Sequence, residues 1–348
     1  MKSSDTSGQV GAFAKSLIPQ RAPVLPSWSV GYANPTTDLA ISRSTQSTHP
    51  PVFRVVVGDP VMVAISNAMD DTIREANQAG SEGKVRVPFI SATYKYRPAG
   101  SHPADPPSYE QNLCKRSNLH EALTTFQPGE PLMSLYPISA TGGVFSNNVL
   151  VHTGPGDKYE PLEQPRYLPV ISVNPLRRPT VTNNGARYSN KRDKDIMREK
   201  IRGALLISLY HNYDRVVIGD FGMGNVHHNP PQLLAEIWRD LFLFDPVLRG
   251  HFACVVFAFE DPTQSTTQWF WDQRVKRTQR EYKRKQSVKS AMDYYTTSKF
   301  TSTTAEWSNS LPLAPTDMAI FQSVFHRDEI KRVLRTPNPR CSIAMMLS

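Results

Sequence analysis

The clearest pattern of hydrophobic and polar positions lies between residues 213 and 259. A short β-rich run at 215–219 leads into a loop that carries three glycines. Asn229 and two prolines then precede apolar residues at helical spacing. Because asparagine is a good N-cap and proline is tolerated in the first turn, a helix is expected to start there. A second apolar run at 252–259 predicts a buried strand, so the stretch has about the size of one βαβ unit.

The loop of this unit contains Gly219, Gly222 and Gly224. Glycines allow positive φ, and their N–H groups can surround an anion near the N-terminus of a helix. A phosphate or pyrophosphate site is one interpretation of the loop, and a simple tight turn is the other. The spacing matches neither the Rossmann fingerprint nor the P-loop, whose Lys-Ser/Thr pair is missing here.

The rest of the chain alternates predicted strands with predicted helices. Strands are expected from Val52 and at 85–92, 148–152 and 169–173, and helices at 62–76, 110–123 and 195–212. Pro88 falls inside the second of these strands, which indicates an edge position or a bulge. This alternation predicts an α/β fold in layers, with a ligand at the carboxyl ends of the strands.

Composition adds limits to this picture. The 348 residues suit one large domain with extensions or two small ones, and 29 prolines against 18 glycines indicate much loop. Residues 1–50 are rich in Ser, Thr and Pro without periodicity, so we expect them to be mostly disordered. Three scattered cysteines do not make a disulfide framework, and no secretion signal or membrane span is visible. An intracellular protein, cytoplasmic or nuclear, is therefore expected.

The net charge of +9 is concentrated in one segment, 274–289, which holds eight basic residues and one acid. A solvated helix or tail is one interpretation. Alternatively, the lysines and arginines neutralise nucleic-acid phosphates while the nearby Trp269, Trp271 and Tyr282 stack on bases. A nuclear localisation signal has the same composition.

Four blocks in order carry a resemblance to a known family: 108–119, 136–151, 169–179 and 216–238. They resemble the microbial-type poly(ADP-ribose) glycohydrolases, a branch of the macrodomain fold, and most of all the fungal members. Residues 317–330 resemble the last helix of that family. The resemblance implies a macrodomain-like α/β/α sandwich with a mixed sheet over 51–335. A basic and aromatic insertion at 262–315 would interrupt this domain, and 336–348 would form a tail.

The resemblance also implies an ADP-ribose cleft, in which backbone N–H groups of the 219–228 loop hold the diphosphate. His227 is the nearest candidate for the family's aromatic residue that stacks on adenine. Gly142 and Gly143 take a ligand role by resemblance, although a hairpin turn also accounts for them. The ligand-binding positions implied are Gly100, Ser101, Gly142, Gly143, Gly219, Gly222, Met223, Gly224, Asn225 and His227.

The family's catalytic signature is a proline and three glycines, a short spacer, then Gln-Glu-Glu shortly before Leu-Cys. Residues 113–114 are Leu-Cys and align with the end of this signature. The Gln-Glu-Glu then corresponds to Tyr-Glu-Gln at 109–111. The proline and three glycines correspond to Pro-Ala-Gly-Ser at 98–101. The spacing is kept and the residues are not. In the family the second Glu protonates the leaving oxygen, and its counterpart here, Gln111, has no titratable proton.

General acid–base catalysis supplies about 10²–10⁴-fold, so this replacement should impair hydrolysis. The first prediction is therefore an ADP-ribose-binding protein with slow or absent turnover. An active glycohydrolase that uses the neighbouring Glu110 is the alternative, and a nucleic-acid-binding protein with a vestigial macrodomain is a third. Whether the protein is an enzyme stays open at this stage.

The other chemically active side chains have simpler interpretations. His227 and His228 are adjacent and lack a nearby Cys or carboxylate, so no metal site is expected, and no cofactor. Cys114 is expected to be a buried thiol, because no base adjoins it. Asp220 either orients the glycine loop or lies in solvent. The expected partners are ADP-ribose or its polymer and, through 274–289, nucleic acid; no membrane is expected.

Overall fold

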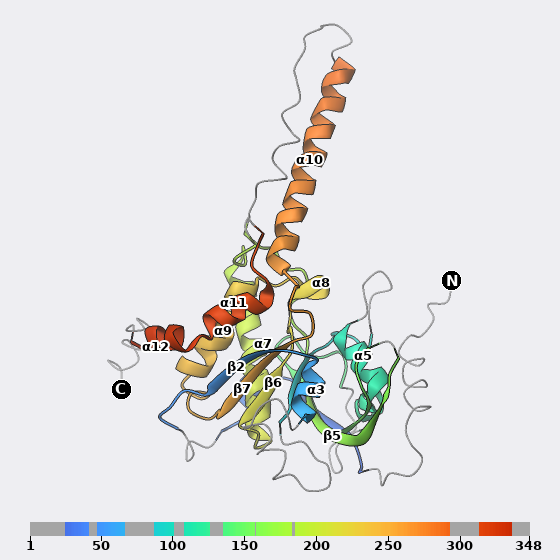
Figure 1. Ribbon diagram of the computed structural model, residues 1–348, viewed down its shortest axis with the longest axis vertical. Helices are drawn as coiled ribbons and strands as arrows, with labels where there is room; N and C mark the ends of the chain where they lie inside the picture. The colour runs from blue at the N-terminus through green and yellow to red at the C-terminus, as the bar shows by residue number, and fades with distance from the viewer. Residues whose placement is uncertain are drawn as a thin grey trace.

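A seven-stranded mixed sheet carries the fold in the computed structural model (Figure 1). The structure describes residues 25–41, 47–66, 87–100, 108–125, 135–156, 158–182, 185–292 and 313–335. The sheet has the order β1-β4-β5-β3-β6-β7-β2. Its strands are β1 (Trp28–Tyr32), β2 (Val52–Val57), β3 (Phe89–Ala92), β4 (Gly143–Thr153), β5 (Pro161–Val173), β6 (Arg215–Ile218) and β7 (Cys254–Phe259).

The five strands β5, β3, β6, β7 and β2 are parallel, whereas β4 runs antiparallel to both β5 and β1. Parallel strands are buried on both faces, which explains why the runs at 169–173, 215–218 and 254–259 are almost wholly apolar. Their carboxyl ends meet at one edge of the sheet, which is where a ligand is expected.

Helices cover both faces of the sheet. Side chains alternate across a strand, so Ile90 of β3 joins one hydrophobic cluster and Phe89 joins the other. The first cluster contains α7 (Lys191–Tyr210), α9 (Pro231–Phe244), α11 (Asp317–Val324) and α12 (Arg327–Arg335). The second contains α3 (Pro60–Ile65), α5 (Tyr109–Arg116) and α6 (Leu119–Ala122). The predicted α/β fold class, with helices on both faces of a mixed sheet, is confirmed.

Several boundaries differ from the predictions. Within 1–50, the described part includes β1 and α2 (Pro35–Asp38), so the expectation of disorder is wrong for these residues. β1 pairs with β4 as an edge strand of the sheet, and α2 packs against α7. A five-residue strand and one turn of helix are too short to show a period in sequence. The predicted tail at 336–348 lies outside the described residues.

Two further corrections concern proline and side-chain capping. Pro88 does not mark an edge, because β3 lies between β5 and β6; the proline precedes the strand, and its carbonyl still accepts from Val217 N. The helix expected at 62–76 begins at Pro60, where the Asp59 side chain caps it by accepting from Met62 N at 2.8 Å. It ends at Ile65, and residues 67–86 lie outside the described chain.

The helix expected at 110–123 is two helices, because Ser117 is extended and forms a bridge to β4. Asn118 then accepts from Leu150 N at 2.7 Å, which ties the break to the sheet. This long-range hydrogen bond favours an interruption that local helix propensity does not indicate.

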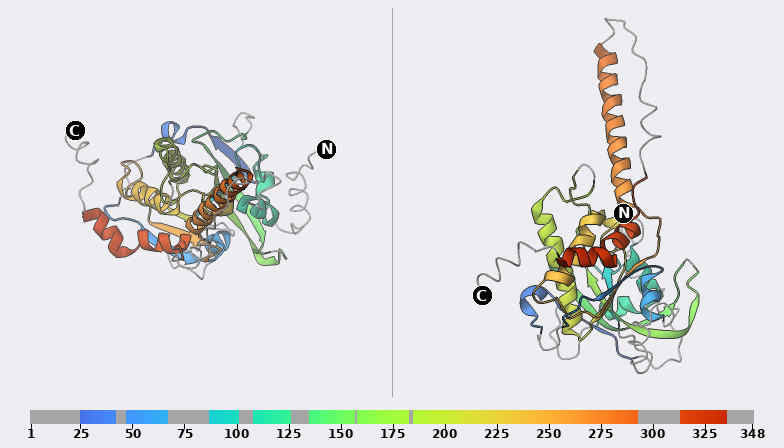
Figure 2. Two further views of the ribbon diagram at one scale, coloured as in Figure 1. Left: turned by 90° about the horizontal axis from the view of Figure 1, so that it is seen from above. Right: turned by 60° about the vertical axis from the view of Figure 1, so that its left-hand side comes forward.

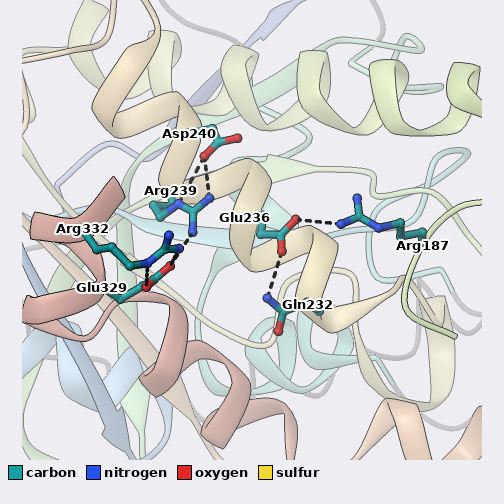
Figure 3. A network of polar contacts seen from close by, with 7 residues as sticks. All are labelled: Arg187, Gln232, Glu236, Arg239, Asp240, Glu329 and Arg332. Atoms are coloured by element: carbon teal, nitrogen blue, oxygen red, sulfur yellow. Dashed lines mark hydrogen bonds and ion pairs between the residues drawn. The ribbon is translucent and has the colours of Figure 1, made fainter. Parts of the chain in front are cut away.

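Polar contacts join α9 to its surroundings on the solvent side (Figure 3). Arg239 lies 3.0 Å from Asp240 on α9 and 3.6 Å from Glu329 on α12, and Glu329 also pairs with Arg332 at 2.7 Å. Toward the other end of α9, Glu236 accepts from Gln232 and lies 3.9 Å from Arg187. Arg187 and Arg332 are exposed, so their pairs contribute little stability, whereas Arg239 and Glu329 are half-buried and the buried Ile330 packs α12 into the core.

The most conspicuous element is α10 (Thr266–Met292), which extends away from the body as a single long helix (Figures 1 and 2). It lies between β7 and α11, within the 262–315 segment predicted to be an insertion. Its root contacts the body: Trp269 stacks on His228, and Phe270 packs against Gly185. Among the described residues, no helix is long and apolar enough to cross a membrane.

Trp238 tests the packing of the first cluster. Its indole is fully buried, with ring centroids 5.6 Å from Phe221 and 6.1 Å from Phe257. We expect Trp238→Ala to lower the free energy of unfolding by about 3–5 kcal/mol in urea denaturation. Leu313→Ala, at a side chain that is 85% exposed, is the control and should change it by less than about 0.5 kcal/mol. Equal effects of both substitutions would contradict this packing.

Candidate functional site

A cleft of about 260 Å³ opens at the carboxyl ends of β3, β6 and β7. Its walls come from segments far apart in the sequence. The loop after β6 contributes Asp220, Met223, Val226 and His227, and α5 contributes Tyr109 and Asn112 with Ser108 before it. The end of β7 contributes residues 258–261, and Gln264 follows just before α10. This is the edge at which an α/β sheet places its ligands.

The glycine loop needs its glycines for conformation. Gly222 and Gly224 have φ of 79° and 66°, a region that residues with a Cβ rarely adopt. A Cβ on Gly224 would also lie 2.6 Å from Gln264 Oε1. The Gly224 N–H donates to Thr266 Oγ1 at 2.9 Å, so the first turn of α10 already binds one amide of the loop. The loop ends in a short helix, α8 (Gly224–His227), which the sequence analysis missed.

The sequence analysis predicts Asn229 as the N-cap of α9, and this is wrong, because the N-cap is Pro230. Asn229 instead stabilises the glycine loop. The Asn229 side chain is fully buried and donates to Gly222 O at 2.7 Å and Leu176 O at 2.8 Å. It also accepts from Tyr188 Oη at 2.8 Å. Three hydrogen bonds to a buried side-chain amide contribute more stability than a single hydrogen bond at a partly exposed helix N-cap.

Two buried histidines follow the glycines. His227 lines the cleft, its ring 6.5 Å from that of Tyr94, and burial lowers its pKa to about 3. His228 has φ 55° and stacks on Trp269 at 3.6 Å, and burial lowers its pKa to about 4. Both rings are therefore neutral at pH 7. No group of three or more potential metal ligands occurs in the part of the chain that the structure describes.

Positive charge lies on one side of this loop. Arg178 N donates to His227 O at 2.6 Å, and the Arg177 guanidinium lies 5.9 Å from the centre of the Tyr94 ring. Both arginine side chains are exposed. The sequence analysis did not single them out, although the 169–179 block that contains them is one of the four that carry the resemblance.

Negative charge lines the other side. Asp220, Glu260 and Asp261 all face the cleft. Of the two placements expected for Asp220, the one in open solvent is therefore wrong. Burial, and then the charge of Asp317, raise the pKa of Asp220 to about 6. Burial and the charge of Asp59 likewise raise the pKa of Glu260. The cleft is therefore electrostatically two-sided, and an anion is attracted to the arginine side.

Glu110 is fully buried in α5 and does not line the cleft. Its Oε1 accepts hydrogen bonds from Thr93 Oγ1 and, at 3.3 Å, from Tyr136 Oη. Burial raises its pKa to about 7, against the opposing effect of these two hydroxyls. Gln111 is half-buried, and its backbone N–H donates to the N-cap Ser108 at 3.2 Å. Both residues adjoin cleft-lining Tyr109 and Asn112 on the same helix.

A buried ion pair fixes α5 under the cleft. Arg116 donates to both carboxylate oxygens of Asp59, at 2.9 and 3.2 Å, and Tyr109 Oη donates to the same carboxylate at 2.7 Å. Buried charges of this kind are paired and hydrogen-bonded. The partners are far apart in sequence, so no local pattern indicates this pair.

The remaining predicted positions have mixed placements. Ala99, at the first glycine of the family signature, is buried with φ 50°, so the backbone keeps a glycine-like conformation without the glycine. Gly100 N donates to Arg97 O, whereas Ser101 lies outside the described residues. Asn225 lies in α8.

Three other positions lie away from the cleft wall. Gly142 lies against the Tyr32 carbonyl, and Gly143 starts β4 against Ile207 and Val173. Neither lines the cleft, so their ligand role stays a prediction. Cys114 is fully buried, and burial raises the pKa of its thiol, as expected for a core cysteine.

The raised pKa of Glu110 predicts a pH-dependent stability. From its usual pKa of 4.5 to about 7, the unfolded chain ionises this carboxyl more readily than the folded one, so wild type loses stability as pH rises through this window. Glu110→Gln removes the penalty and keeps an acceptor for Thr93 and Tyr136. We expect the variant to gain roughly 3 kcal/mol relative to wild type between pH 4.5 and pH 8 in urea unfolding. A pH-independent difference would contradict the burial of an ionisable carboxyl.

No family model and no curated protein matches the chain. Among solved structures, the chain is similar to poly(ADP-ribose) glycohydrolase from Thermomonospora curvata, with 18% identity, 78% of this chain and 89% of that chain covered, and a TM-score of 0.49. It is also similar to poly(ADP-ribose) glycohydrolase from Deinococcus radiodurans in complex with ADP-ribose, with 17% identity, 75% and 92% covered, and a TM-score of 0.49.

Proposed function

We propose that this protein binds ADP-ribose in the cleft at the carboxyl ends of β3, β6 and β7. One observation carries the proposal. The two segments that the sequence resemblance assigns to the ligand, the 219–228 loop and the helix with Glu110 and Gln111, line or adjoin the same cleft. More than 100 residues, including β4, β5, α7 and β6, separate them in the chain, so their meeting is not a consequence of local sequence.

The two-sided electrostatics orient such a ligand. Its diphosphate belongs beside the glycine loop and Arg177, where positive charge attracts it. Its adenine amino group and ribose hydroxyls are hydrogen-bond donors, and the carboxylates of Asp220, Glu260 and Asp261 accept them. The distal ribose then lies toward α5.

We further propose that hydrolysis is slow or absent, because Gln111 occupies the position of the family's general acid. The rival is Glu110, whose pKa of about 7 suits an acid that must hold its proton near neutral pH. Glu110 is fully buried, however, and its carboxyl faces Thr93 and Tyr136 instead of the cleft. A general acid must come within hydrogen-bond reach of the leaving oxygen, so Glu110 acts only after α5 or its neighbours move.

Calorimetric titration with ADP-ribose tests the binding. We expect wild type to bind and Gly224→Val to lose at least tenfold in affinity, because a valine there is strained at φ 66° and meets Gln264. Gly156→Val is the matched control, since Gly156 also has positive φ, at 91°, but has no atom near its Cβ position. Wild type that shows no heat of binding at millimolar ADP-ribose would rule the proposal out.

Release of ADP-ribose from its polymer tests the catalytic position. Gln and Glu are nearly isosteric, so Gln111→Glu should fold normally and restore a proton donor. We expect wild type to be inert or slow and Gln111→Glu to gain activity. The gain should be partial, because Ala99 replaces a family glycine. If instead wild type is efficient and Glu110→Gln abolishes turnover, Glu110 is the acid and the aligned register is wrong by one residue.

A further inference from the structure

One N–H group of the glycine loop is already bound within the protein. The Gly224 N–H has a single hydrogen, which it donates to Thr266 Oγ1 at 2.9 Å. Gln264 lies over the same residue, because its Oε1 would be 2.6 Å from a Cβ on Gly224. An oxygen from the root of α10 therefore accepts the hydrogen that a phosphate at this loop would otherwise accept.

Asp317 fixes Thr266 in this position. Thr266 is buried, and its hydroxyl donates to Asp317 Oδ2 at 2.7 Å while its backbone N–H donates to Asp317 Oδ1 at 2.9 Å. Because the one hydroxyl hydrogen is donated to the carboxylate, Thr266 Oγ1 acts toward Gly224 as an acceptor. The carboxylate polarises the hydroxyl, which makes its oxygen a better acceptor. The three groups form a buried chain that runs from the amide through the hydroxyl to the carboxylate.

A second contact holds the end of the loop. Trp269 lies three residues after Thr266, on the same face of α10, and its ring stacks on that of His228 with centroids 3.6 Å apart. Figure 1 shows α8 beside the base of α10. This contact has a cost, because His228 is buried and neither of its ring nitrogens has a hydrogen-bond partner among the described residues. That cost lowers the free energy needed to separate α10 from the loop.

We infer that the Gly224–Thr266 hydrogen bond is an autoinhibitory contact, which an anionic ligand must break in order to bind. This inference rests on the proposed function and concerns the regulation of that site. A phosphate oxygen forms a charge-assisted hydrogen bond, roughly twice as strong as one to a neutral oxygen, so a diphosphate regains the free energy lost when Thr266 is displaced. A nucleoside has no anionic oxygen and leaves the contact intact.

The experiment removes the acceptor and keeps the shape of the side chain. Thr266→Val replaces the hydroxyl with a methyl group of similar size, whereas Thr266→Ser keeps the hydroxyl. Thr278→Val is the matched control, since it makes the same change on an exposed turn of α10, where the hydroxyl donates to Arg274 O of the same helix. Binding of ADP-ribose and of adenosine to each protein is measured by calorimetry.

We expect Thr266→Val to bind ADP-ribose about three- to tenfold more tightly than wild type, because the Gly224 N–H no longer has to leave a protein acceptor. Thr266→Ser and Thr278→Val should bind ADP-ribose as wild type does. Adenosine should bind all four proteins alike, because it does not compete for this hydrogen.

Amide hydrogen exchange in wild type tests the same contact without a substitution, and it decides the question if Thr266→Val does not fold. Addition of ADP-ribose should slow exchange in residues 219–228, where the ligand binds. It should speed exchange in residues 264–270, because the root of α10 loses its bond to the loop.

Three outcomes overturn the inference while the proposed function stands. If Thr266→Val binds ADP-ribose as wild type does or more weakly, the hydroxyl either has no effect or positions the amide for the ligand. If adenosine affinity rises as much as ADP-ribose affinity, the substitution acts by enlarging the cleft. Unchanged or slower exchange in 264–270 shows that binding leaves the contact in place. Absence of ADP-ribose binding in wild type and in every variant is instead the failure of the proposed function, and the inference fails with it.

Discussion

A buried carboxylate, Asp317, joins the segments on which the site depends. It accepts from Thr266 N at 2.9 Å, from Thr266 Oγ1 at 2.7 Å and from Gln264 Nε2 at 3.0 Å. Thr266 Oγ1 in turn accepts the Gly224 N–H, so one side chain on α11 sets the root of α10 and one corner of the glycine loop. A buried carboxylate needs such donors, because leaving it unpaired costs several kcal/mol. The direction in which α10 leaves the body therefore follows from the same bonds that shape the cleft.

Three buried carboxyls near the cleft are stabilised in different ways, and their chemistry differs accordingly. Asp59 has a guanidinium partner in Arg116, and Asp317 has an amide N–H, a side-chain amide and a hydroxyl. Glu110 accepts from the hydroxyls of Thr93 and Tyr136 and from backbone N–H groups of Tyr94 and Ala99, and burial raises its pKa to about 7. A carboxyl without a cation is held in its protonated form by burial alone. The same burial that keeps the Glu110 carboxyl away from solvent therefore brings its pKa near 7, the range suited to proton transfer.

The sequence predicts the elements whose signal is local. The strands at 215–218 and 254–259, the helix α9 and the need for glycine at Gly222 and Gly224 all follow from periodicity and backbone freedom. It does not predict β1, which is too short, or the interior place of β3, because strand order depends on contacts between distant residues. It misassigns Asn229, whose three hydrogen bonds reach Leu176 and Tyr188. The Asp59–Arg116 pair and the Gly224–Thr266 bond are missed for the same reason.

Charges of opposite sign lie on different sides of the cleft. Asp220, Glu260 and Asp261 place negative charge on one wall of the cleft, while Arg177 lies near His227 on the side of the glycine loop. Since charges of both signs act over about 8–10 Å at physiological salt, they would orient an anionic ligand before contact. A ligand that takes the Gly224 N–H must also release it from Thr266, so binding in the cleft and the anchoring of α10 share one hydrogen bond. By linkage, whatever shifts α10 must change affinity at the loop, and the reverse.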